Sequence, residues 1–269
     1  MSGWKSAEVA ERWKENAEAR NRYLAAATEA MFDLARLAPG MRVLELGTGS
    51  GDVALLASAR VGPSGRVLAV DSSSGMVDAA RTSVRDAGAA NVTVETMDAQ
   101  ALRLPDAGFE AALARMVLMF MDDLPHALSE IARVLVPGGR FAATVWSAPE
   151  NNPFHAALIE VARGFGPLPE PAPEIVRAFR LCDAEALRRA VEAAGFADVE
   201  IRAVRSERVV SSIPAEIARQ RTWAPVAALF ASLDEPARDR AWAQVEERWR
   251  AHGGVFPQEI LVLGASTIS

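Results

Sequence analysis

Cysteine and histidine are scarce in this chain. Its 269 residues include a single cysteine, Cys182, and three histidines. One cysteine excludes an intrachain disulfide bond and a zinc site built on several cysteines. Cys182 comes just before a predicted helix, where a small, half-buried residue is a more frequent finding than a nucleophile. We therefore predict no metal site.

An excess of basic residues is also lacking. The chain carries 35 acidic and 29 basic residues, which gives a formal net charge of -6. Proteins whose main partner is a nucleic acid need a surplus of Lys and Arg to bind phosphates. We therefore expect no nucleic-acid partner.

Long hydrophobic runs are absent as well. The best candidate, residues 111–121, is interrupted by Arg115, whereas a membrane-spanning helix needs about 18 apolar residues. The N-terminal segment is charged throughout and has no apolar stretch of the kind found in secretory signals. We therefore expect a cytoplasmic protein without a membrane span.

The chain does contain enough apolar material for a large core. Hydrophobic residues make up 50% of it and charged residues 24%, as in ordinary globular proteins. Short apolar segments alternate with helical patterns, an order that predicts a parallel sheet with helices on both faces. The predicted fold class is α/β with a doubly wound sheet. Its expected strands are residues 42–46, 66–70, 91–95, 109–114, 140–146, 198–204 and 259–264.

Three regions are expected along the chain. Residues 1–38 are predicted to form an N-terminal helical cap, because this segment is rich in Ala, Glu, Arg and Lys and contains no proline. Residues 39–146 hold the first five strands and form the α/β core. Residues 147–269 complete the sheet and carry two helical insertions, residues 147–173 and 206–256, which we expect to cover the site as a lid.

Glycines and a carboxylate follow the first two predicted strands. In a doubly wound sheet, ligands bind at the carboxyl ends of the strands. The loop of residues 47–51 has three glycines, lets a ligand approach the backbone and opens a helix whose amides favour an anionic group. Asp71 ends the second strand beside this loop, where it can accept hydrogen bonds from ribose hydroxyls. The simpler alternatives are a tight turn and a helix cap.

The glycine pattern differs from that of a dinucleotide site. The glycines run Gly-x-Gly-x-Gly, and Asp52 stands where the third glycine of Gly-x-Gly-x-x-Gly would be. Glu45 lies two residues before the loop, and a carboxylate there suits an ammonium group better than two phosphates. An NAD(P)-dependent oxidoreductase is therefore an alternative that the loop opposes.

Four segments together resemble the motifs of class I methyltransferases that use S-adenosylmethionine (SAM). They are residues 43–51, 67–71, 97–105 and 134–140, in the order and spacing of that family. The most similar subgroup is the one of ubiquinone and menaquinone biosynthesis methyltransferases. The resemblance implies a Rossmann-like sheet of seven strands, whose last strand is antiparallel and lies between the fifth and sixth, and it implies SAM as cofactor.

The resemblance also implies roles for single residues. The glycine loop would pack against the methionine part of SAM, Asp71 would hold the ribose, and Asp98 would accept from the adenine amino group. Arg115 would lie near the sulfonium and the methionine carboxylate, and Tyr23 would cover the cofactor. The expected cofactor-binding residues are Tyr23, Glu45, Gly47, Thr48, Gly49, Gly51, Asp71, Ser72, Met76, Asp98, Ala99 and Arg115.

A general base is harder to assign. Of the three histidines, His126 and His252 stand at helix ends, whereas His155 follows the fifth strand and is the best candidate for a catalytic residue. The family often has a histidine pair after the fourth strand, but this chain has Met119 and Phe120 there. That wall of the pocket is therefore expected to be apolar.

These observations predict transfer of a methyl group to a small, largely apolar molecule, such as a quinone-like or natural-product acceptor. Two alternatives share the same motifs: SAM-dependent chemistry without methyl transfer, such as cyclisation, and a non-catalytic SAM-binding subunit. The acceptor, the methylated atom, the use of a base and the oligomeric state, with a homodimer as one option, are left open. Six aromatic residues offer surface for the acceptor pocket, and we expect some of them to be packing residues instead: Phe154, Phe165, Trp223, Phe230, Trp242 and Trp249.

Overall fold

The computed structural model describes residues 7–268, so the first six residues of the predicted N-terminal cap lie outside the described part. The strands form one sheet of seven in the order β3-β2-β1-β4-β5-β7-β6. Strands β1 to β5 pair in parallel, whereas β7 runs antiparallel to both β5 and β6. The predicted fold class is therefore confirmed, including the antiparallel last strand. The strands are β1 (Arg42–Leu46), β2 (Arg66–Asp71), β3 (Val92–Thr96), β4 (Phe109–Arg115), β5 (Leu135–Trp146), β6 (Phe196–Val209) and β7 (Val255–Thr267).

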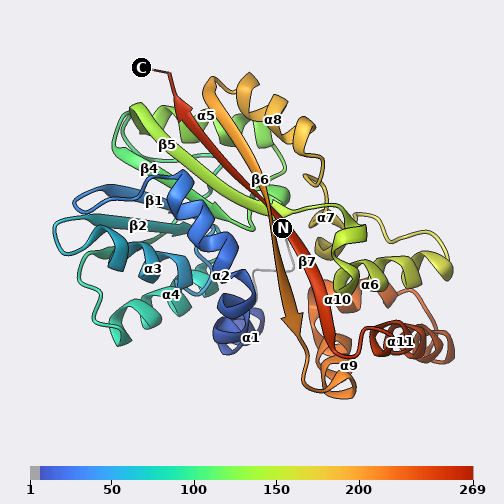
Figure 1. Ribbon diagram of the computed structural model, residues 1–269. Helices are drawn as coiled ribbons and strands as arrows, with labels where there is room; N and C mark the ends of the chain where they lie inside the picture. The colour runs from blue at the N-terminus through green and yellow to red at the C-terminus, as the bar shows by residue number, and fades with distance from the viewer. Residues whose placement is uncertain (1–6, 269) are drawn as a thin grey trace.

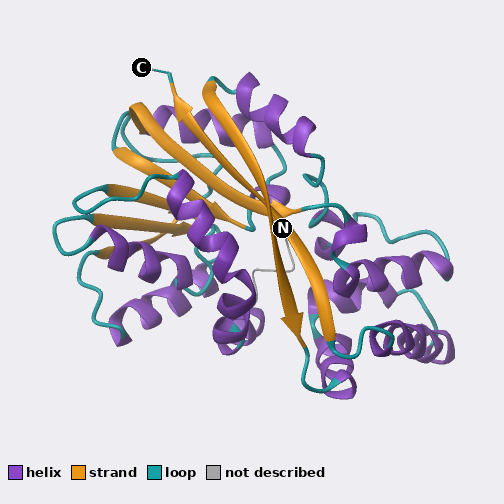
Figure 2. Ribbon diagram, in the orientation of Figure 1, coloured by secondary structure: helices purple, strands orange, loops and turns teal. Residues whose placement is uncertain are grey.

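Helices flank the sheet and also gather at one end of it (Figure 2). Central strand β1 is buried on both faces, with Val43, Leu44 and Leu46 fully excluded from solvent, as expected for a strand between two helical layers. No helix of the described chain is long and apolar enough to cross a membrane. The helices are α1 (Ala7–Glu15), α2 (Ala17–Leu34), α3 (Asp52–Val61), α4 (Ser74–Asp86), η1 (Leu118–Phe120), α5 (Leu124–Val134), η2 (Pro149–Asn151), α6 (Pro153–Gly164), α7 (Glu174–Arg177), α8 (Ala184–Ala193), α9 (Ile213–Thr222), α10 (Ala224–Ala227), η3 (Ala228–Phe230) and α11 (Glu235–Arg250).

The predicted N-terminal helical segment consists of two helices, α1 and α2. The helical conformation is interrupted at Asn16, whose side chain donates to the carbonyl oxygen of Arg12 at 2.7 Å. Asparagine favours such local hydrogen bonds over a continuous helix. Because of the break, α2 packs against β5, β6 and β7, whereas α1 packs against α4.

Strands β6 and β7 are much longer than predicted. They stay paired until Val209 faces Val255, so the segment between them is residues 210–254 rather than 206–256. Charged side chains in the last part of β6 hide its strand pattern in the sequence. In Figure 1 this ribbon leaves the sheet and reaches α9 and α11. We call α6, α7, α9, α10, η3 and α11 together the helical extension.

The helical extension has an aromatic core of its own. The rings of Phe154 and Trp249 stack with centroids 4.3 Å apart, and Trp249 Nε1 donates to the carbonyl oxygen of Phe154 at 3.1 Å. Phe230 and Trp242 pack at 4.9 Å, and all four side chains are buried. These four side chains do not line the cavity but hold the extension together, as expected for some of the six aromatic residues.

Candidate functional site

A cavity of about 870 Å³ opens between the carboxyl ends of β1, β2 and β4 and the helical extension. This volume lies in the upper part of the range of small-molecule sites, about 300–1,000 Å³. Gly51 is not among the residues that line it. With φ of +88°, Gly51 precedes α3, and a Cβ there would lie 3.3 Å from Ala80 on α4, so packing accounts for this glycine. The predicted site residues that do line the cavity are Tyr23, Glu45, Gly47, Thr48, Gly49, Asp71, Ser72, Met76, Asp98, Ala99, Arg115 and His155.

The other two glycines of the loop allow close approach of neighbouring side chains. Both have positive φ, +64° at Gly47 and +56° at Gly49. A Cβ on Gly47 would lie 2.4 Å from Val117, and one on Gly49 would lie 2.7 Å from Trp13 Nε1. Substitution at either position therefore requires both an unfavourable backbone conformation and displacement of a neighbour.

Asp71 connects the end of β2 to the glycine loop. Its Oδ2 accepts from the backbone N–H of Gly49 at 3.0 Å, and its Oδ1 accepts from that of Ser73 at 2.9 Å. Burial raises the pKa of this carboxyl. The cap of α4 is Ser73, whose hydroxyl accepts from Met76 N. Each carboxylate oxygen of Asp71 keeps capacity to accept another hydrogen bond from a ligand.

Glu45 is a buried carboxyl in the wall of the cavity. It is 2% exposed, and its Oε2 accepts from Thr48 Oγ1 at 2.6 Å. Burial raises the pKa of Glu45 to about 8, an effect that the Thr48 hydrogen bond and the charge of Arg115 only partly oppose. A carboxyl in this state gains from a cationic group placed next to it.

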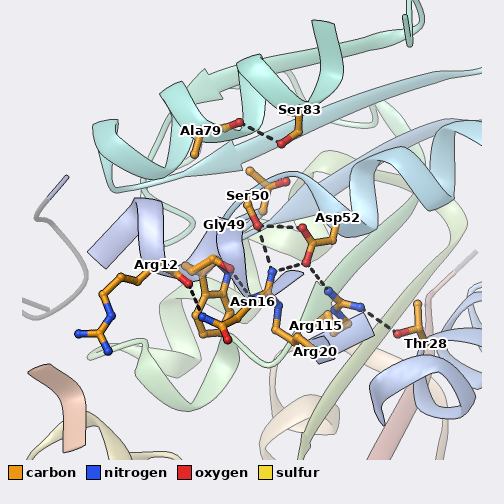
Figure 3. Close-up of polar contacts among 12 residues, drawn as sticks. Arg12, Asn16, Arg20, Thr28, Gly49, Ser50, Asp52, Ala79, Ser83 and Arg115 are labelled. Carbon is orange, nitrogen blue, oxygen red and sulfur yellow. Dashed lines mark hydrogen bonds and ion pairs between the residues drawn. The ribbon is translucent and has the colours of Figure 1, made fainter. Parts of the chain in front are cut away.

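Two arginines share one carboxylate beside the loop (Figure 3). Asp52 Oδ2 accepts from Arg20 Nη2 and, at 3.3 Å, from Arg115 Nη2. The three side chains are 6–8% exposed. Among the described residues, the buried Nε of Arg20 has no hydrogen-bond partner. This group therefore carries one net positive charge and a free donor, which suits an anionic ligand group.

Arg20 is one of the cavity residues that sequence reasoning missed. It lies on α2 in a segment whose many charged residues look solvated. Its position becomes clear only in three dimensions, where its guanidinium lies over the Trp13 ring at 4.0 Å and its Nη1 donates to the Trp13 carbonyl oxygen.

Helix α1 joins the glycine loop to the helical extension. Arg12 donates to the carbonyl oxygens of Thr222 at 2.7 Å and Arg219 at 3.0 Å. The rings of Trp13 and Trp223 stack at 6.4 Å. The first helix thus covers the cavity from the side of the loop and contacts α9 at the other end.

The end of the cavity near the helical extension combines apolar and polar walls. Met119 and Phe120 line it, as the sequence predicted, together with Arg208 and His155. The His155 ring lies 4.7 Å from that of Trp146. Burial, and then the charge of Arg208, lowers the pKa of His155 to about 3, so its imidazole is neutral at physiological pH.

Asp98 lies at the rim. Its side chain is exposed, and its Oδ1 accepts from the backbone N–H of Gln100 at 2.9 Å. No group of three or more His, Cys, Asp and Glu side chains within residues 7–268 is placed to hold a metal ion.

Part of the sequence is similar to known methyltransferases. Residues 43–139 match the family described as a methyltransferase domain. The demethylmenaquinone methyltransferase of Symbiobacterium thermophilum is 37% identical over 112 residues, which cover 41% of this chain and 45% of that protein. The ubiquinone/menaquinone biosynthesis C-methyltransferase UbiE of Shewanella frigidimarina is 35% identical over 122 residues, 45% of this chain and 49% of that protein. The chain thus spans about half the length of the curated relatives it matches.

Solved structures share the fold over most of the chain. A putative methyltransferase from Bacillus halodurans superposes with a TM-score of 0.61 at 20% identity, covering 90% of this chain and 99% of that one. A SAM-dependent methyltransferase from Aquifex aeolicus gives 0.57 at 19% identity, with coverage of 92% and 93%.

Residues 43–139 therefore match a methyltransferase domain, and the whole sheet has the fold of methyltransferases of known structure. The prediction of a methyltransferase domain is thus confirmed for this part of the chain.

Proposed function

We propose that this chain transfers the methyl group of SAM to a small, largely apolar organic molecule. The observation that carries the proposal is a single cavity that runs from the glycine loop to the apolar wall of Met119 and Phe120. The relatives named as quinone-biosynthesis methyltransferases support a quinone-like acceptor. In this proposal the helical extension acts as the substrate lid, and α1 and α2 act as the N-terminal cap over the α/β core.

The side chains at the glycine loop suit the parts of SAM. Asp71 would accept hydrogen bonds from the ribose hydroxyls, and Asp98, at the rim, would accept one from the adenine amino group. Glu45 would face the ammonium group, whereas Arg20 and Arg115 would bind the methionine carboxylate with their surplus positive charge. The other residues proposed to contact SAM are Tyr23, Gly47, Thr48, Gly49, Ser72, Met76 and Ala99.

Methyl transfer asks little chemistry of the protein. When bound, SAM supplies an activated methyl group, and the methyl–sulfur bond breaks with its electron pair remaining on sulfur. The residues of the chain align the acceptor with that methyl group and exclude water. The stacked Trp13 and Trp223, which join the cap to the lid, support this role.

His155 is the proposed catalytic residue, and its pKa of about 3 limits what it can do. An efficient general base has a pKa near the working pH. An imidazole with a pKa of about 3 is too weak a base to take up a proton at neutral pH. We propose that His155 acts as a neutral hydrogen-bond partner of the acceptor.

We also propose a cytoplasmic enzyme whose partner is the small acceptor rather than a nucleic acid. The net charge of -6 supports the absence of a nucleic-acid partner, since a negatively charged protein repels a polyanion. Light scattering of the purified protein would show whether it is the homodimer that the sequence left as an option.

Incubation of the protein with methyl-labelled SAM and extracts of small molecules tests the proposal. We expect label in an organic product that is one methyl group heavier than its precursor. A product formed only in the presence of SAM, but with unchanged mass relative to its precursor, would instead show SAM-dependent chemistry without methyl transfer. No product from any extract, with SAM bound, would favour a binding subunit.

Proton release on cofactor binding is expected from Glu45. Below about pH 8 the free protein holds a proton on this carboxyl, and the ammonium group of SAM favours the ionised form, so binding expels the proton. Affinity for SAM should therefore rise with pH between about 6 and 7.5, by up to about tenfold per pH unit. Calorimetry in buffers of different ionisation enthalpy measures the proton, and Glu45→Gln should remove the effect. Equal affinity across this range in the wild type contradicts the assignment.

A further inference from the structure

The lid end of the cavity contains a charged cluster that methyl transfer by itself does not require. Arg208, near the end of β6, is 12% exposed in its side chain and lines the cavity. Its Nη2 donates to Glu216 Oε1 on α9 at 3.1 Å. A guanidinium has five N–H groups, so one bond to Glu216 leaves most of its donors for another partner.

Aromatic rings fix the plane of this guanidinium. The Arg208 Cζ lies 3.7 Å from the centroid of the Phe154 ring and 5.1 Å from that of Tyr23. Stacking occupies the flat face of the guanidinium, whereas hydrogen bonds use its edge. The side chain is therefore held in place without using up its donors.

Glu216 does not neutralise the cluster. It also accepts from Arg219, through Nε at 2.8 Å and Nη2 at 2.5 Å, and from Gln220 Nε2 at 2.9 Å. Two guanidinium groups thus share one carboxylate, which leaves one net positive charge in a poorly solvated place. Burial lowers the pKa of Arg208, an effect that its hydrogen bond to Glu216 and the charge of Glu216 oppose only in part.

An unpaired acceptor belongs to the same cluster, because Gln220 and Arg208 both donate to Glu216. Gln220 is 4% exposed and lines the cavity, and its Oε1 has no hydrogen-bond partner in the described part of the chain. Buried amide oxygens are rarely left without a donor, so an unpaired one in a cavity wall points to a ligand N–H or O–H.

We propose that Arg208 binds an anionic oxygen of the acceptor, a phenolate or an enolate, and that Gln220 accepts from a hydroxyl group next to it. The inference rests on the proposed function and names the acceptor class of the same site. One positive charge among apolar walls matches an apolar body that carries one weakly acidic hydroxyl group. A strong polyanion would find too little positive charge, and an acceptor without such a group would leave Arg208 and Gln220 unpaired.

This pairing activates the acceptor without a protein base. The field of Arg208 lowers the pKa of the acceptor hydroxyl, so its proton passes to water. The resulting oxyanion, or the carbon conjugated to it, donates an electron pair to the methyl carbon. The methyl–sulfur bond breaks, and sulfur keeps its electron pair and loses its positive charge. No oxidant or reductant takes part.

Matched chromophoric probes test the inference with S-adenosylhomocysteine present at saturation. The wild type should bind 4-nitrophenol at least about tenfold more tightly than 4-nitroanisole. The absorption spectrum should show the bound phenol ionising at lower pH than the free phenol. Arg208→Gln should weaken binding of the phenolate about 10- to 100-fold and leave 4-nitroanisole unchanged. Gln220→Leu should remove any preference for 4-nitrocatechol over 4-nitrophenol.

The variants have controls in the same structure. Glu216 keeps Arg219 and Gln220 as partners in Arg208→Gln, so the fold should persist. Arg202→Gln removes an arginine from the same strand whose side chain is 50% exposed and pairs with Glu200, and it should change neither probe.

The outcomes separate the inference from the proposed function. If the wild type binds S-adenosylhomocysteine but prefers 4-nitroanisole or shows no preference, the inference is wrong and the proposed function stands. The inference is also wrong if Arg208→Gln weakens both probes equally. If the wild type does not bind S-adenosylhomocysteine, the proposed function itself fails.

Discussion

Replacing Asp71 with alanine should abolish most SAM binding while the protein stays folded. The ribose hydroxyls would lose the carboxylate that accepts their hydrogen bonds, and hydrogen bonds to charged groups contribute about 1.5–3 kcal/mol each. The substitution would also release the backbone N–H of Gly49, which the carboxylate holds at 3.0 Å, so the glycine loop would lose its anchor. The expected loss of affinity is at least about 100-fold, measured by calorimetric titration.

The control for this substitution lies on the following helix. Asp78 of α4 is 75% exposed and pairs with Arg81, so Asp78→Ala should bind SAM as the wild type does. Circular dichroism of both variants verifies the fold. Unchanged affinity in a folded Asp71→Ala protein would show that Asp71 does not bind the ribose and that the site does not depend on its hydrogen bond to the glycine loop.

Replacing Asp52 with alanine should lower the stability of the fold more than any of the other substitutions proposed above. It would leave Arg20 and Arg115 buried with no carboxylate between them, and breaking a buried ion pair by removing one partner costs about 3–5 kcal/mol. Such a loss lowers the melting temperature of a protein of this size by about 10 °C. Thermal unfolding without ligand measures it.

An exposed ion pair provides the matched control for Asp52. Glu160 pairs with Arg248 at the surface, where both side chains are about half exposed. Glu160→Ala should cost less than about 1 kcal/mol, as exposed pairs do. Equal effects of the two substitutions would mean that Asp52 does not organise the two arginines. A double variant in which Arg20→Met accompanies Asp52→Ala should recover part of the loss, because one unpaired charge is then gone.

The site residues that the sequence predicted are those set by local structure. Asp71 and Glu45 follow from the strand–loop–helix pattern, since the end of a strand and the next loop lie together in any sheet of this kind. Arg20 and Arg208 could not be predicted in this way. Each lies in a charged segment that looks solvated, and each becomes buried only when segments distant in sequence pack over it.

The helical extension shows the same division between local and distant effects. The sequence predicted that this region is helical, but not how many helices it forms or how long β6 and β7 are, because the strand ends carry charged residues and pair beyond the body of the sheet. The aromatic residues were visible in the sequence. Phe154 packs on Trp249 and Phe230 on Trp242, and none of the four lines the cavity; this arrangement depends on how the helices meet.

Calorimetric titration of the wild-type protein with SAM, and separately with NAD, tests the central claim most directly. The glycine loop, Asp71, Glu45 and the Arg20–Asp52–Arg115 group all match a nucleoside joined to an amino acid, whereas a dinucleotide would bring its phosphates close to Glu45. The account predicts saturable binding of SAM at one site per chain and no binding of NAD. Binding of NAD without binding of SAM would contradict it.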